Sequence, residues 1–116
     1  MKIYIAGKIT GDPDYLDKFE NVRIGIRHAA KVAFRDEEGF ILPSQISVLN
    51  PSDLPSGMAP EDYMRICIAM IDSADAVIFQ PSYRESRGAQ VELMYCDYIG
   101  KPYGVLPDNW EAVAWV

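Results

Sequence analysis

The residues with the clearest potential for chemistry lie in a segment that joins a short apolar run to a helix-like stretch. It reads SRGAQVE over residues 86–92. Ser86 is expected to cap the helix, and the free amides of the first turn together with Arg87 form a natural site for a phosphate or another anion. Helix side chains lean toward the N-terminus, so Glu92 is expected to project over Gly88 into an open crevice. A carboxylate beside an anion suits chemistry at a sugar carbon next to a phosphate. The alternative is a solvated helix glutamate.

A glycine-containing loop at residues 6–11 provides the second group of candidate contacts. It reads AGKITG, and its glycines allow close backbone approach to a ligand. Lys8 and Thr10 offer a cation and a hydroxyl, so Gly7, Lys8, Ile9 and Thr10 are candidate ligand-binding residues. The spacing matches neither a Walker A loop nor a dinucleotide-binding GxGxxG fingerprint. A simple glycine turn with a solvated lysine is therefore the alternative.

Other polar residues are secondary candidates. Tyr4 lies on a predicted central strand and belongs either to the core or to the crevice. Asp72 and Asp75 flank the start of another strand, where an aspartate often caps a turn. His28 has arginines nearby on a predicted helix and is interpreted as a surface residue rather than a base.

Composition excludes several classes of protein. The chain has 116 residues and a net charge of -6, so a nucleic-acid polymer is not an expected partner. Cys67 and Cys96 lack the spacing of a zinc site and are interpreted as buried thiols, and no metal or cofactor is expected. The chain enters a strand pattern at once, without a leader segment or an apolar run of membrane-spanning length, which favours a cytoplasmic protein.

Strand-like and helix-like segments alternate along the whole chain. The fully apolar run at residues 76–79 is typical of a central parallel strand buried on both faces. Alternation of this kind predicts an α/β fold, with one domain over residues 1–116. Its core is a small doubly wound parallel sheet, Rossmann-like or flavodoxin-like, with four to five strands flanked by helices. Ligands bind such sheets beyond the carboxyl ends of the strands, so the loops at residues 7–12 and 80–87 are expected to matter most.

The boundaries and faces of these elements follow from turn residues and apolar spacing. A solvated excursion is expected over residues 35–44, and Gly100 is expected to end the third helix. The strands are predicted at residues 2–6, 46–49, 76–79 and 103–106. Four helices are predicted. The first carries the apolar positions Leu16, Phe19, Val22, Ile26, Ala30 and Ala33, and the second covers residues 60–73. The third has Val91, Met94, Tyr95 and Tyr98 on a common face, and the fourth is short and capped by Asp108.

Nearly the whole chain resembles the nucleoside 2-deoxyribosyltransferase-like superfamily. Within it, the sequence is similar to small phage and bacterial proteins that begin with a KIYIAGKITG-type segment, and it is related to nucleoside 5'-monophosphate N-glycosidases. The motifs that carry the resemblance are residues 2–11, Asn50-Pro51, residues 74–77, Ser86-x-Gly88-x-x-x-Glu92 and residues 100–102.

The resemblance implies a function and roles for individual residues. Glu92 corresponds to the glutamate that attacks the anomeric carbon, and the positions matching Gly7 to Thr10 and Ser86 to Gly88 line the sugar and phosphate. The implied activity is cleavage of the N-glycosidic bond of a nucleoside or nucleotide by double displacement, as an N-glycosidase or a deoxyribosyltransferase. Cys67 stands where relatives carry the acid that helps to protonate the leaving base. The alternative is therefore a catalytically weak nucleotide-binding or sensing module of the same fold.

A homodimer or higher oligomer is also expected. The C-terminal segment holds Trp110, Val113, Trp115 and Val116, and a domain of this size has limited interior for two tryptophans. Relatives in the resembled superfamily complete their sites across subunits.

Overall fold

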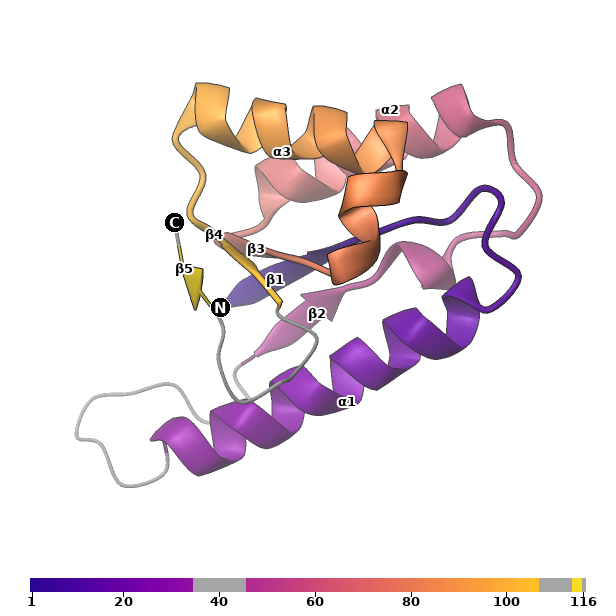
Figure 1. Cartoon of the computed structure of the whole chain (residues 1–116). Helices are drawn as coiled ribbons and strands as arrows, with labels where there is room; N and C mark the ends of the chain where they lie inside the picture. The colour runs from indigo at the N-terminus through magenta and orange to yellow at the C-terminus, as the bar shows by residue number, and fades with distance from the viewer. Residues whose placement is uncertain (35–45, 107–113, 116) are drawn as a thin grey trace.

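Strands and helices alternate along the chain in the computed structural model, which describes residues 1–34, 46–106 and 114–115 (Figure 1). Two short 3-10 helices, η2 (Pro51–Asp53) and η3 (Pro81–Glu85), follow the second and third strands. The strands are β1 (Lys2–Ala6), β2 (Ser47–Leu49), β3 (Ala76–Phe79), β4 (Tyr103–Val105) and β5 (Ala114–Trp115), and the α-helices are α1 (Tyr15–Phe34), α2 (Pro60–Ser73) and α3 (Arg87–Ile99).

The sheet has the strand order β2-β1-β3-β4-β5. The first four of these strands are parallel, which confirms the predicted parallel α/β fold. In the centre of the sheet Tyr4 of β1 lies opposite Val77 of β3. Strand β5, which the sequence did not indicate, pairs antiparallel with β4 at the edge. The predicted excursion at residues 35–44 and the helix capped by Asp108 lie outside the described residues.

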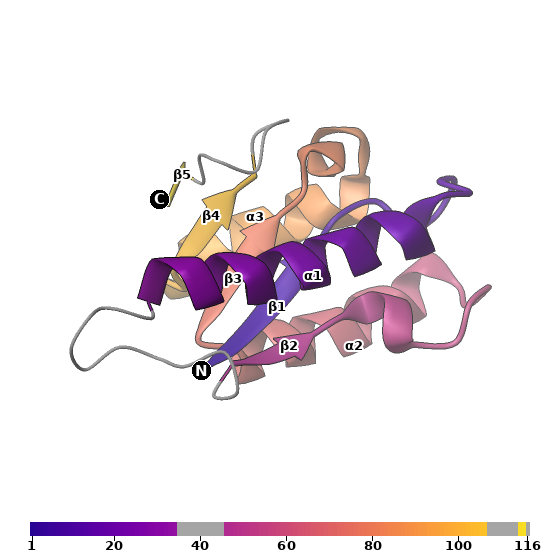
Figure 2. The same ribbon diagram turned by 90° about the horizontal axis from the view of Figure 1, so that it is seen from below.

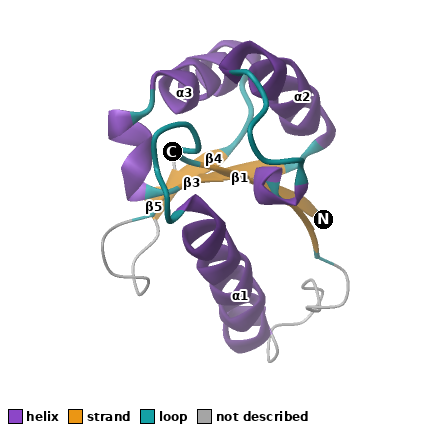
Figure 3. Cartoon of the chain, turned by 90° about the vertical axis from the view of Figure 1, so that its right-hand side faces the viewer, coloured by secondary structure: helices purple, strands orange, loops and turns teal. Residues whose placement is uncertain are grey.

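Helices cover both faces of the sheet, as Figures 2 and 3 show: α1 lies on one face, and α2 and α3 lie together on the other. Strand β1 contributes side chains to a core on each face of the sheet, because successive side chains of a strand point to opposite faces. Ile3 and Ile5 pack with the side chains of α1. Tyr4 and Ala6 pack with α2 and α3. The polar hydroxyl of Tyr4 therefore lies on the face that carries α3.

Helix α1 buries a narrower face than its apolar pattern predicts. Phe19, Val22 and Ile26 are buried in the core, but Leu16 is 51% exposed. On an ideal helix Leu16 lies about 90° from the centre of the face formed by the three buried residues. The prediction that Leu16 shares the buried face was wrong, because Leu16 lies at the side of the helix rather than on the face that packs in the core. The side chains of Ala30 and Ala33 lie outside the described part of α1.

The ends of α3 are the predicted ones, but its buried face is not. The Ser86 hydroxyl accepts a hydrogen bond from the Ala89 amide, and Gly100 adopts a left-handed conformation (φ 72°) at the C-terminus. The face that packs on the sheet carries Ala89, Glu92 and Cys96. The expected apolar face lies on nearly the opposite side of the helix, where three of its four members, Val91, Met94 and Tyr98, are exposed.

The unequal burial along α1 predicts unequal effects of truncation. Ile26→Ala is expected to lower the free energy of unfolding by about 2–5 kcal/mol, because it removes packed methyl groups and leaves a cavity. Leu16→Ala is the matched control on the same helix, with an expected loss of about 0.5 kcal/mol or less. Urea unfolding followed by circular dichroism measures both, and equal losses would show that Leu16 is packed.

Candidate functional site

A cavity of about 480 Å³ opens at the carboxyl ends of the strands, between the loop after β1, helix α2 and the start of α3. Its volume lies in the usual range for small-molecule sites. The structure thus brings the two loops singled out in the sequence to one cavity. The residues that line it are Gly7, Ile9, Thr10, Pro60, Tyr63, Met64, Cys67, Glu85, Ser86, Arg87, Gly88, Ala89 and Glu92.

Glu92 lies on the wall of this cavity in a buried position rather than in the open crevice that the sequence predicted. Glu92 is 6% exposed and lies on the face of α3 that also carries the buried residues Ala89 and Cys96. The Tyr4 hydroxyl donates a hydrogen bond of 2.5 Å to Glu92 Oε1. No described residue donates to the other oxygen, Oε2, so this is the oxygen available to a ligand.

Burial controls the charge on this pair. It raises the pKa of Glu92 from 4.5 to about 7, and the hydrogen bond from Tyr4 opposes that rise. Burial and the neighbouring Glu92 charge raise the pKa of Tyr4 well above its ordinary value. Tyr4 therefore remains a protonated donor, while Glu92 is divided between its neutral and charged forms near neutral pH. Tyr4 was expected to belong either to the core or to the crevice. It belongs to both, because its ring lies in the core and its hydroxyl contacts Glu92.

Cys67 of α2 lines the same cavity beside the Tyr4 hydroxyl. Burial raises the pKa of this thiol from 9.0 to about 11, so the sulfur is protonated at neutral pH. The cavity wall thus holds a neutral thiol at position 67. Glu85 is the other carboxylate among the residues that line the cavity, and it is exposed on η3.

The start of α3 contributes backbone amides and a cation. The first amides of an α-helix have no acceptor within the helix and carry a partial positive charge. Ser86, Arg87 and Gly88 all line the cavity, and Arg87 is exposed. A Cβ on Gly88 would lie 3.3 Å from the Met64 Cε atom of α2. Glycine therefore keeps this end of the cavity open between the two helices.

The loop after β1 reaches the cavity through Gly7, Ile9 and Thr10. A Cβ on Gly7 would lie 2.6 Å from the Gln80 Nε2 atom, so any larger residue at position 7 would require the Gln80 side chain to move. Gln80 is buried directly after β3. The sequence motifs did not indicate this residue, although a polar residue at the end of a fully apolar strand was the available signal.

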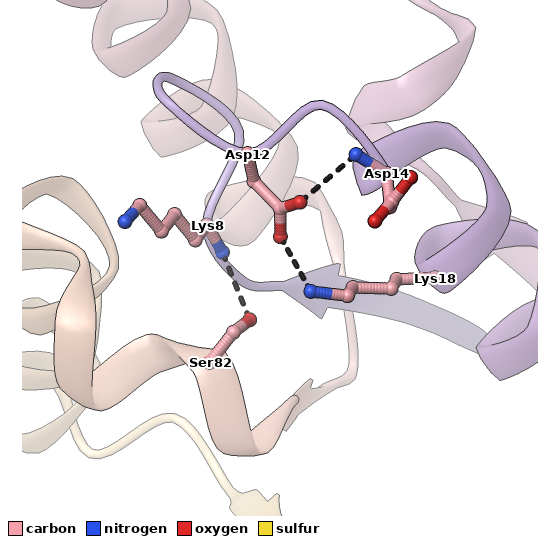
Figure 4. A network of polar contacts seen from close by, with 5 residues as sticks. All are labelled: Lys8, Asp12, Asp14, Lys18 and Ser82. Carbon is pink, nitrogen blue, oxygen red and sulfur yellow. Dashed lines mark hydrogen bonds and ion pairs between the residues drawn. The ribbon is translucent and has the colours of Figure 1, made fainter.

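Lys8 does not line the cavity, in contrast to its neighbours. Its amide donates a hydrogen bond of 3.2 Å to Ser82 Oγ, which joins the loop to η3 (Figure 4). Nearby, the Asp12 carboxylate accepts hydrogen bonds from the Asp14 amide and the Lys18 ammonium group. The bond from Lys18 lowers the pKa of Asp12, whose side chain is 8% exposed, whereas the Lys18 side chain is 50% exposed. These contacts set the path of the loop into α1.

The remaining candidates lie elsewhere. Asp72 accepts a hydrogen bond from the Tyr95 hydroxyl at the exposed ends of α2 and α3, and it does not line the cavity. Asp75 accepts a hydrogen bond from the Lys2 amide, and His28 is exposed on α1.

Across the described residues, no group of three or more His, Cys, Asp or Glu side chains is arranged to hold a metal ion. None of the described helices is long and apolar enough to cross a membrane.

These features define the class of protein: a doubly wound parallel α/β domain, Rossmann-like in topology, with a carboxylate on the wall of a cavity at the carboxyl edge of its sheet. The chain belongs to the family described as Domain of unknown function (DUF4406), whose family model matches residues 1–103. Every residue that lines the cavity falls in the matched part. Comparisons with curated proteins and with solved structures gave no match.

The burial of Glu92 predicts a pH dependence of stability. The folded chain binds the proton of the Glu92 carboxyl group more tightly than the unfolded chain does. The stabilisation that results is fully present below pH 4.5 and is lost as pH rises through about 7. A pKa difference of this size corresponds to roughly 3 kcal/mol. Urea unfolding at a series of pH values should therefore show that the free energy of unfolding depends less on pH in Glu92→Gln than in the wild type. Glu20→Gln, an exposed control on α1, should keep the wild-type slope; the same slope for Glu92→Gln would contradict the burial of its charge.

Proposed function

We propose that this protein is a nucleotide-directed N-glycosidase or deoxyribosyltransferase-like enzyme, with Glu92 as its nucleophile. The observation that carries the proposal is the buried Glu92 carboxylate, which lies on the cavity wall with one oxygen held by Tyr4. The motifs that resemble the nucleoside 2-deoxyribosyltransferase-like superfamily support the same assignment, because Glu92 matches the nucleophile of that superfamily.

The environment of Glu92 suits a nucleophile. Burial removes water from the carboxylate and raises its pKa, which makes the charged form more reactive than a solvated glutamate. The hydrogen bond to Oε1 fixes the rotation of the carboxylate and leaves Oε2 for attack. Gly88 keeps the space beside Glu92 narrow but open. A sugar in the cavity would meet a positioned carboxylate oxygen rather than a mobile one.

The start of α3 supports recognition of a phosphate. The amides of the first turn attract an anion, and Arg87 adds a full charge that is able to form paired hydrogen bonds with phosphate oxygens. Glu92 lies on the same helix, little more than one turn from Arg87. A nucleoside monophosphate is therefore the substrate class that uses both groups: its phosphate binds at Arg87 and its anomeric carbon faces Glu92.

The reaction proposed for this arrangement is a double displacement. Glu92 Oε2 forms a bond to C1' of the sugar as the bond from C1' to the base nitrogen breaks, and the base takes the electron pair. Water or a second base then attacks C1' and loses a proton, which neutralises the departed base, and the ester bond to Glu92 breaks with return of the carboxylate. Water gives hydrolysis, and a second base gives transfer. No cofactor takes part in either step.

A nucleotide-binding or sensing module is the second candidate. Cys67 favours it, because a buried thiol with a pKa of about 11 is a poor donor of a proton to the leaving base. General acid assistance contributes about 10² to 10⁴ to rates of this kind. A protein without it would bind nucleotides in the same cavity and turn them over slowly or not at all.

Replacing the nucleophile distinguishes the two candidates. The test incubates the protein with ribo- and deoxyribonucleoside monophosphates and follows thermal stabilisation and release of free base. Glu92→Gln should bind the best nucleotide but release base about 10³-fold more slowly or worse, because the amide cannot attack C1'. Glu20→Gln should match the wild type. Mass spectrometry of the wild type should find a glycosyl adduct. Stabilisation without base release would select the sensor, and equal turnover by Glu92→Gln would remove Glu92 from the mechanism.

The pH profile of base release tests the hydrogen bond from Tyr4. Only the charged form of Glu92 attacks, so the rate should rise with pH through about 7. Tyr4→Phe removes the bond that lowers the pKa of Glu92, and the midpoint of the rise should move up by about one to two pH units. Tyr103→Phe, which removes a hydroxyl that bonds to Asp97 away from the cavity, is the control and should leave the midpoint in place. An unchanged midpoint in Tyr4→Phe would contradict this role.

A further inference from the structure

A second cavity, of about 460 Å³, lies between α1 and the segment at η3. Lys18 and Asn21 line it from α1, and Gln80, Ser82 and Arg84 line it from the chain after β3. Its volume suits a small molecule. Among the described residues it shares one lining residue, Glu85, with the first cavity, on whose wall Glu92 lies. The second cavity is thus a separate place, and the proposed reaction does not use it.

Hydrogen-bond donors dominate the walls of the second cavity. Ser82 and Lys18 reach it from η3 and α1 (Figure 4). The Lys18 ammonium group has three protons and gives one to Asp12, which does not line the cavity. Ser82 Oγ accepts a hydrogen bond from the Lys8 amide, so its own proton remains for another acceptor. The walls therefore offer several donors to one bound molecule.

Gln80 adds a buried donor without a partner. The residue is 4% exposed and lines the cavity, and its Nε2 atom makes no hydrogen bond to any described residue. A buried N–H group without an acceptor destabilises the folded chain, so an acceptor is expected beside it. Asn50 Nδ2 is also buried without a partner, but Asn50 does not line this cavity. Gln80 thus indicates a ligand that carries acceptor oxygens.

The charged residues indicate the kind of acceptor. Lys18 and Arg84 are cations, and Glu85 is the one carboxylate among the residues that line this cavity. The Arg84 guanidinium lies over the Tyr83 ring, with its Cζ atom 5.0 Å from the ring centre, which holds the charge on η3. Two cations and neutral donors favour a phosphate group. Glu85 only accepts hydrogen bonds when charged, so it favours a hydroxyl on the same ligand.

We propose that the second cavity binds a small phosphorylated polyol or sugar. Its phosphate lies between Lys18 and Arg84, with Ser82 and Gln80 as further donors, and a hydroxyl group donates to Glu85. Inorganic phosphate would satisfy the cations but would bring a like charge to Glu85 without a hydroxyl to separate them. The inference does not depend on Glu92 or on the reaction proposed for the first cavity.

Two exposed arginines distinguish the cavities, because Arg84 lines only the second and Arg87 only the first. Calorimetric titration uses glycerol 3-phosphate as the probe, and Arg87→Gln as the background in which the first cavity lacks its cation. This protein should still bind the probe. Adding Arg84→Gln should weaken binding about tenfold or more, through the loss of a charged hydrogen bond. Adding Arg84→Lys, which keeps the charge, should weaken it less.

The same titrations contain the outcomes that would contradict the proposal. Glycerol, which has no phosphate, should not bind, and inorganic phosphate should bind more weakly than glycerol 3-phosphate. Absence of binding to the wild type, or loss of all binding in Arg87→Gln alone, would overturn the second site. Equal binding with and without Arg84→Gln would overturn it as well.

Nuclear magnetic resonance locates the bound probe independently. In nitrogen–proton correlation spectra, glycerol 3-phosphate should shift the side-chain amide signals of Gln80. The side-chain amide signals of Asn50 are the matched control and should stay in place, because this buried amide lies outside the cavity. Shifts confined to the backbone amides of residues 86–88 would place the phosphate in the first cavity and contradict the proposal.

Discussion

The hydrogen bond from Tyr4 to Glu92 is the interaction on which the arrangement of the site depends. It joins the central strand to α3 across 88 positions of sequence. A carboxylate in an apolar core is costly unless a donor meets it, and the cost rises further if it is charged. Tyr4 supplies that donor and stays neutral itself. The pair therefore holds a group with a raised pKa in a fixed orientation at the wall of a cavity, which is a common property of functional sites.

The same contact explains the unusual outer surface of α3. Cys96 of this helix packs with residues of the sheet, and Ala89 is buried on the same face, so Glu92 lies between two small side chains. A larger residue at either position would push the helix away and separate Glu92 from Tyr4. Val91, Met94 and Tyr98 lie on the other side of the helix and are exposed, whereas Leu93 and Tyr95 pack partly against the core. The buried carboxylate on the cavity wall and the exposed apolar residues on the surface are thus two results of one packing arrangement.

Much of the fold could be predicted because it depends on neighbours in the sequence. The Ser86 cap, the Gly100 terminus and the apolar run of β3 are local features, and each is where the sequence indicated. The contact between Gly7 and Gln80 is not local. A glycine after a strand has the same appearance in the sequence whether a ligand or a side chain approaches it, and here a glutamine 73 positions away fills the space. Strand β5 was missed because two residues carry too little pattern to identify a strand.

The sequence by itself determined the class of fold, the meeting of two loops at the strand ends and the place of Glu92 near the start of a helix. All three follow from periodicity, caps and the geometry of parallel sheets. Only the tertiary structure decided that Glu92 is buried against Tyr4, that Lys8 does not line the cavity and that α3 turns Val91, Met94 and Tyr98 outward. Helical spacing shows which residues share a face, but which face packs depends on how closely the helix approaches the sheet, and that distance is set by side chains far apart in the chain.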